Sequence, residues 1–100
     1  MRIGAHVPVM GDYRKMADYA VSVGCECVQI FAKNARQYRF SMPSSKKVGE
    51  MREAIGAHPE LVVYSHAAYS INLSGADPEI RDRSVKSLAG ELAILSLIHI

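Results

Sequence analysis

The sequence has few cysteines and no long apolar run. Cys25 and Cys27 are spaced C-x-C, whereas a zinc knuckle needs a second cysteine pair and a redox motif needs two intervening residues. We therefore predict reduced thiols, at least one of them packed in the core. No apolar run is long enough to span a membrane, and the N-terminus lacks the apolar segment of a signal peptide. We expect a soluble cytoplasmic protein with no membrane partner.

Acidic residues are also missing from one part of the chain. None occurs between Glu26 and Glu50. That stretch contains aromatic residues and the cations Lys33, Arg36, Arg39, Lys46 and Lys47. An ordinary solvated loop has such a composition, so the charge alone does not separate a binding surface from a simple exposed one. The net charge of +2 says little about partners either.

The chain of 100 residues is 49% hydrophobic and 22% charged, which is enough for one domain with a core. Short apolar or β-branched runs predict strands at residues 2–7, 27–32 and 61–65. Helices are expected to follow each strand, beginning after Asp12, at Ser44 or Ser45, and at Asp77. Gly24 and Gly56 are the predicted stops of the first two.

The order strand, helix, strand, helix, strand, helix is typical of a parallel sheet with right-handed crossovers. Three such units do not close a barrel, since a complete (β/α)8 barrel has eight strands and about 250 residues. The pattern therefore indicates either a small open three-layer domain or a piece of a larger barrel.

The last residues depart from the helical pattern, with neither a turn nor a polar finish. Residues 95–100 are what CTG TCT CTT ATA CAC ATC encodes, a transposon-end adapter sequence used in library preparation. We predict that the native sequence stops at about Ile94, that residues 95–100 are a non-native tail, and that His99 carries no function.

His66 is the first candidate for chemistry. It follows the third predicted strand directly, at the edge where barrel enzymes assemble their active sites. A neutral imidazole there can bind zinc through one ring nitrogen, and a packed or surface histidine is the alternative. His6, at the end of the first strand, favours a site because strand ends converge. His58 lies in a turn at the opposite end and is expected to be structural or exposed.

The loop at residues 33–38 is the second candidate. It places a lysine, two carboxamides, an arginine and a tyrosine within a few positions. Arg36 can grip a phosphate with two parallel hydrogen bonds, and Asn34 and Gln37 can donate to phosphate or sugar oxygens. Many surface loops have a similar composition, so this pattern alone is a weak indication of DNA binding.

Three motifs in register carry a family resemblance. They are IGAHV at residues 3–7, QIFAKNARQY at residues 29–38 and HAAYSINL at residues 66–73. Together they resemble the opening motifs of the endonuclease IV family. The resemblance covers residues 2–94, which correspond to the first third of a family member.

The resemblance implies an α/β fold in which residues 1–94 form the first three β/α units of a (β/α)8 TIM barrel, left incomplete. It implies a DNA-repair endonuclease of the deoxyribonuclease IV type, a zinc-dependent hydrolase that cuts the phosphodiester 5′ to abasic sites with metal-activated water. The expected cofactor is a multi-zinc cluster in the full-length protein. The expected partner is double-stranded DNA with abasic sites, bound by a monomer.

The resemblance also implies roles for single residues. His66 matches a zinc-binding histidine, and Arg36 and Tyr69 match residues that enter the DNA and hold the damaged nucleotide out of the stack. Asn34 and Gln37 match polar residues of the same recognition loop, and His6 matches a pocket residue with no ligand role. No catalytic residue is assigned within this chain.

Two alternatives remain open. A sugar isomerase or epimerase of the xylose-isomerase-like barrel type shares the fold and often a strand-end histidine, but it has no need for the cationic loop. A non-catalytic truncated fragment is the other alternative. One histidine cannot hold a zinc cluster, so the hundred residues by themselves are expected to be inactive.

Overall fold

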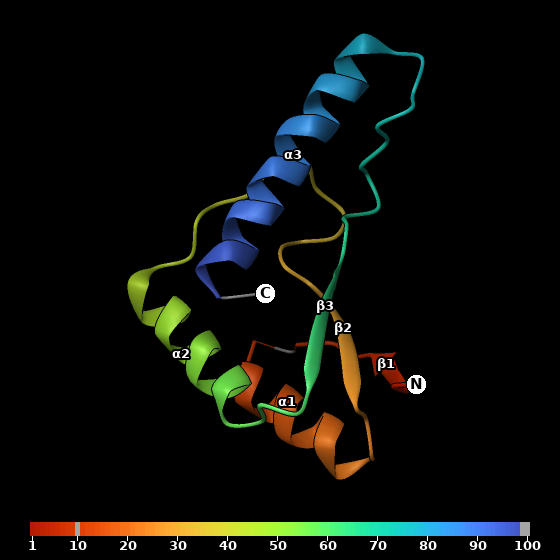
Figure 1. The fold of residues 1–100 in the computed structure, drawn as a ribbon. Helices are drawn as coiled ribbons and strands as arrows, with labels where there is room; N and C mark the ends of the chain where they lie inside the picture. The colour runs from red at the N-terminus through yellow and green to blue at the C-terminus, as the bar shows by residue number, and fades with distance from the viewer. Residues whose placement is uncertain (10, 99–100) are drawn as a thin grey trace.

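The computed structural model describes residues 1–9 and 11–98. Its elements are β1 (Gly4–His6), α1 (Tyr13–Ser22), β2 (Cys27–Phe31), α2 (Ser45–Gly56), β3 (Val62–His66) and α3 (Pro78–Leu97), shown in Figure 1. The predicted alternation of strands and helices is confirmed.

Side-chain caps start the helices where the sequence predicts. The Asp12 carboxylate accepts hydrogen bonds from the backbone N–H of Arg14 and Lys15 at the start of α1. The Ser44 hydroxyl accepts from the N–H of Lys47 at α2, and the Asp77 carboxylate caps α3 ahead of Pro78. Each cap satisfies N–H groups that have no partner within the helix.

The strands form one parallel sheet in the order β1-β2-β3. Strand β3 begins and ends one residue later than predicted, so His66 is the last residue of the strand and does not follow it. Its Cα is in register with that of Phe31 at the end of β2. The hydrogen-bonded ladder, and not a loop, therefore holds the backbone of His66.

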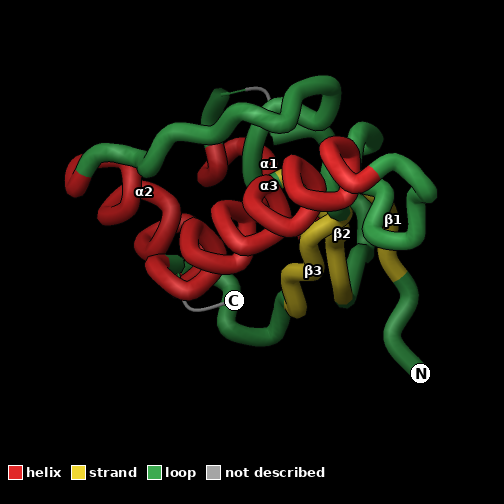
Figure 2. The backbone as a smooth tube through the Cα atoms, turned by 90° about the horizontal axis from the view of Figure 1, so that it is seen from above, coloured by secondary structure: helices red, strands yellow, loops and turns green. Residues whose placement is uncertain are grey.

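All three helices lie on one side of the strands, as Figure 2 shows from above. Val28 and Ile30 point into this side, at 1% and 0% exposure. They pack with buried residues of α1 and α2, among them Met16, Ala20 and Met51. Because side chains alternate along a strand, the opposite face carries Gln29 and its partner Tyr64, which is 54% exposed.

Helix α3 rises beyond the strand ends, and residues 67–77 run beside it (Figure 1). The buried face of this helix carries polar as well as apolar side chains. Val85 and Leu92 are more than half exposed, whereas Ser84, Ser87 and Glu91 are buried. The buried face is the one that meets the loops after β2 and β3, and those loops supply polar partners.

The prediction that the helical pattern ends near Ile94 is wrong. Helix α3 continues to Leu97, and Leu95 and Ile98 are buried, because this end of α3 packs against the core of α1 and α2. The assignment of residues 95–100 as a non-native tail stays a prediction, and His99 lies outside the described residues.

Two smaller predictions concern the cysteines and the membrane. Cys25 and Cys27 are both free thiols, and Cys25 is partly buried against the core. None of the described helices is long and apolar enough to cross a membrane.

Candidate functional site

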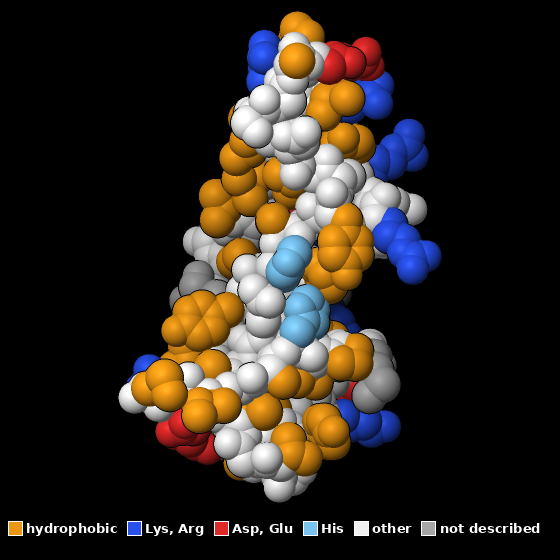
Figure 3. Space-filling view, turned by 90° about the vertical axis from the view of Figure 1, so that its right-hand side faces the viewer, with side chains coloured by type: hydrophobic (Ala, Val, Ile, Leu, Met, Phe, Trp, Pro, Cys, Tyr) orange, Lys and Arg blue, Asp and Glu red, His pale blue; other side chains and the backbone are white. Residues whose placement is uncertain are grey.

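Four rings gather at the carboxyl ends of the strands. The His6 and His66 ring centroids are 5.8 Å apart, and Phe31 lies 4.7 Å from the first and 5.1 Å from the second. Tyr69 joins them at 5.1 Å from Phe31 and 6.0 Å from His66. Figure 3 shows the pair of histidines on the surface, with apolar side chains beside them. The predicted convergence of His6 and His66 is confirmed.

Hydrogen bonding fixes the tautomer of His66. Its Nδ1 lies 2.6 Å from the carbonyl oxygen of Ala67. A carbonyl can only accept, so Nδ1 carries the hydrogen and donates. The lone pair of the neutral ring is then on Nε2, as in metal-ligating histidines whose other ring nitrogen donates to an acceptor. His66 has the chemistry of a zinc ligand.

The surrounding donors do not complete a zinc site. Among residues 1–9 and 11–98, no group of three or more His, Cys, Asp or Glu side chains lies together as metal ligands would. Structural zinc takes four protein ligands and catalytic zinc at least three. The described residues therefore fit one ligand of a zinc centre and do not fit the centre as a whole.

The loops after β2 and β3 are joined to each other. The Tyr69 N–H donates to the Ala35 carbonyl at 2.8 Å. Within the first loop, the Asn34 side-chain oxygen accepts from the Arg36 N–H at 3.0 Å, forming a turn of the Asx type. The backbone beneath Arg36 is therefore fixed relative to that of Tyr69, although the two residues come from different strands.

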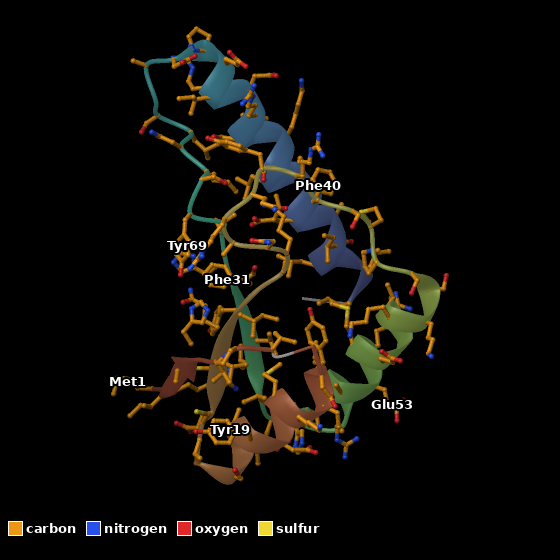
Figure 4. All side chains as sticks on the ribbon, turned by 180° about the vertical axis from the view of Figure 1, so that it is seen from behind. Met1, Tyr19, Phe31, Phe40, Glu53 and Tyr69 are labelled. Carbon is orange, nitrogen blue, oxygen red and sulfur yellow. The ribbon has the colours of Figure 1, made fainter. Side chains whose placement is uncertain are left out.

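The residues predicted to bind DNA are on the surface. Asn34, Arg36 and Gln37 are exposed, and Tyr69 is 69% exposed although its ring contacts Phe31. Figure 4 shows Tyr69 and Phe31 together at this edge. Part of Asn34 is already used by the turn, since its oxygen accepts from Arg36, which leaves its NH2 group for a ligand.

A buried ion pair beneath the loops was not predicted from the sequence. Lys33 Nζ lies 3.7 Å from Glu91 Oε1, with side-chain exposures of 5% and 3%. The same Glu91 oxygen accepts from the Ala68 N–H at 3.0 Å, and Lys33 also donates to the Gln37 carbonyl. Glu91 thus connects α3 to both loops. The sequence signal for this pair is a single carboxylate within the otherwise uncharged residues 88–95. A charge on a buried helix face usually has a partner of opposite charge.

His58 lies at the other end of the sheet, where it is structural as predicted. Its Nε2 lies 2.6 Å from Asp18 Oδ1 and its Nδ1 lies 3.6 Å from Glu60 Oε1. The hydrogen bond from His58, aided by Arg14, lowers the pKa of the Asp18 carboxyl. Both ring nitrogens of His58 face carboxylates, which gives this histidine no free position for a metal.

Comparison with known proteins gives a consistent result. No protein-family profile matches the chain. A probable endonuclease 4 from Halorhodospira halophila is 34% identical over 90% of this chain and 30% of its own length. Another, from Halothermothrix orenii, is 31% identical over 99% of this chain and 36% of its own. The counterpart from Chloroflexus aurantiacus is 36% identical over 91% of this chain and 32% of its own.

The crystal structure of endonuclease IV from Thermus thermophilus superimposes on the whole chain. The TM-score is 0.86 at 32% sequence identity, and the match covers 100% of this chain and 38% of that one. The chain belongs to the endonuclease IV family. It spans about a third of the length of its curated endonuclease 4 relatives. Its three parallel β/α units are thus part of the endonuclease IV barrel.

Proposed function

We propose that this chain is part of a DNA-repair endonuclease of the deoxyribonuclease IV type. The reaction is hydrolysis of the phosphodiester 5′ to an abasic site in double-stranded DNA. The observation that carries the proposal is the joining of two loops at one edge of the sheet. The Tyr69 N–H to Ala35 hydrogen bond joins the loop that exposes Arg36 to Tyr69, whose ring centroid lies 6.0 Å from that of His66.

The proposed roles follow from the chemistry of each side chain. Arg36 contacts a backbone phosphate, and Asn34 and Gln37 donate to phosphate or sugar oxygens. Tyr69 presents an exposed ring that can stack against a base or an abasic gap. His6 is proposed as a pocket residue without a ligand role, since its ring centroid lies 5.8 Å from that of His66.

His66 is proposed as one ligand of a multi-zinc centre, with the remaining ligands outside the described residues. Bound zinc supplies an activated water at neutral pH and neutralises charge on the phosphoryl oxygens. Because this chain supplies too few donors for that centre, the hundred residues alone are proposed to be inactive.

The cationic loop separates this proposal from a sugar isomerase or epimerase on the same type of barrel. A neutral sugar does not need an exposed arginine for binding, whereas a phosphate can accept two hydrogen bonds from the Arg36 guanidinium. A non-catalytic fragment that binds DNA is compatible with the proposed inactivity of the chain alone.

Binding is tested with an abasic duplex and the purified chain. Arg36→Ala is expected to weaken binding and to reduce the dependence of log K on log salt by about 0.9, the value for one lost phosphate contact. Lys46→Ala is the matched control, because Lys46 is also exposed but lies at the start of α2. Equal binding by the two variants would contradict the role of the loop.

Activity is tested with a chimera in which this chain replaces the matching part of the Thermus thermophilus enzyme. The chimera is expected to incise abasic duplex, and His66→Ala is expected to abolish incision with the circular dichroism spectrum unchanged. A folded chimera that retains activity without His66 would refute the ligand role. Metal-dependent incision by the hundred residues alone would refute their proposed inactivity.

A further inference from the structure

A groove runs between the loop after β2 and helix α3. Residues 36–40 form one wall and Arg83, Lys86 and Ser87 form the other. Residues 83, 87 and 90 are spaced by four and three, so they share one face of the helix. A Cβ at Gly90 would lie 2.3 Å from Phe40 Cε1, so the Phe40 ring sits directly on the helix. Figure 4 shows Phe40 beside α3.

The groove is lined by cations from both walls. Arg36 and Arg39 come from the loop, Arg83 and Lys86 come from α3, and no acidic residue is among its described lining. Arg83 pairs with Glu79 and Lys86 with Asp82 one turn earlier. All four of these side chains are more than half exposed, and exposed pairs of this kind are weak. A polyanion can therefore compete for both cations.

Ser87 provides an independent indication of a ligand. It is 1% exposed, and its hydroxyl has no hydrogen-bond partner among residues 1–9 and 11–98 although it lines the groove. Buried hydroxyls are nearly always partnered, so an unpartnered one needs an explanation. A phosphate oxygen in the groove would accept its hydrogen.

We propose that this groove binds the sugar–phosphate backbone of duplex DNA, so that the DNA contact extends from Arg36, at one end of the groove, to Arg83 and Lys86 on α3. The inference rests on the proposed function and extends the DNA-binding surface onto α3, where the family motifs assign no contact. A backbone fits better than a single free phosphate, because the cations are spread over two walls of an open groove that continues to Arg36.

The first test removes charge from the α3 wall. Binding of labelled duplex DNA to the chain is followed by fluorescence anisotropy at several salt concentrations. Arg83→Gln with Lys86→Gln is expected to reduce the salt slope by about two, since each phosphate contact contributes about 0.9. The control is Lys15→Gln with Lys46→Gln, which removes the same charge from exposed positions on α1 and α2 and should leave the slope unchanged.

The second test uses two buried serines. The buried hydroxyl of Ser65 also has no partner in the part of the chain that the structure describes, but Ser65 lies on β3 and does not line the groove. Both Ser87→Ala and Ser65→Ala are expected to raise thermal stability, because each removes an unsatisfied group. Only Ser87→Ala is expected to weaken DNA binding, by a few-fold, with the salt slope unchanged.

The outcomes separate this inference from the proposed function. If the chain binds DNA in an Arg36-dependent way but the α3 variant matches its control, the groove assignment is wrong and the proposed function stands. If the chain binds no duplex, both fail. Inorganic phosphate alone is titrated in parallel. If it shifts the Ser87 amide resonance while duplex DNA does not bind, the groove is a site for a free anion and the inference is refuted.

Discussion

A histidine lies at each end of the sheet, and the two histidines differ in the partners of their ring nitrogens. At the amino end, His58 lies between the carboxylates of Asp18 and Glu60, and both ring nitrogens have a partner. At the carboxyl end, His66 donates once to a carbonyl and otherwise lies among rings. Both ring nitrogens of His58 therefore face carboxylates of the fold, whereas Nε2 of His66 has no hydrogen-bond partner among the described residues.

The ion pairs at the two ends of the sheet differ in their exposure to solvent. The amino-end charges pair with one another on the surface, as Arg14 does with Asp18. At the carboxyl end one ion pair, Lys33 and Glu91, is buried beneath the loops, while Arg36 is exposed above them. At the candidate site, the ion pair that joins the loops to α3 is therefore buried, and the arginine that can bind a ligand is exposed. This arrangement is expected where a rigid scaffold presents a binding loop.

The largest predicted effect concerns the buried pair. Lys33→Met should destabilise the chain by about 3–5 kcal/mol, because it leaves the Glu91 carboxylate buried without its countercharge. Urea unfolding measures this, with the exposed Lys46→Met as the control, expected within about 0.5 kcal/mol of the wild type. A small effect of Lys33→Met would mean that Glu91 does not tie the two loops to α3.

The two histidines are predicted to contribute differently to the stability of the fold. His66→Ala should cost about 1 kcal/mol or less, since it loses ring contacts and one hydrogen bond to a neighbouring residue. His58→Ala should cost more, because it breaks the contact between α1 and the turn before β3. Thermal unfolding of both variants decides this, and the reverse order would overturn the contrast between the two ends.

The smallest effect is a pH dependence at the amino end. The pKa of Asp18 is lowered in the folded state by His58 and Arg14. Its ionised form therefore stabilises the fold above its unfolded pKa of about 3.9, and this contribution is lost as pH falls through the lower folded value. Asp18→Asn should be less stable than wild type at neutral pH, with the difference shrinking below about pH 4. A constant difference from pH 7 to pH 2 would exclude this linkage.

Much of the fold could be predicted from the sequence because its signals are local. Asp12, Ser44 and Asp77 cap the helices as predicted, since an N-cap needs only the next three residues. The strand predicted at residues 61–65 lies one residue later in the structure, because its end is set by pairing with β2. The burial of Ser87 and Glu91 on α3 could not be predicted, since it depends on loops far away in sequence.

The sequence by itself determined the order of elements, the two candidate loops and the resemblance to the endonuclease IV family. These depend on periodicity, capping and motifs, which are properties of neighbouring residues. Only the tertiary structure decided that Tyr69 is hydrogen-bonded to Ala35, that Glu91 is buried against Lys33, and that Ser87 faces a cationic groove. Each of these joins residues from different β/α units, and parallel strands bring such residues together at one edge only when the sheet has formed.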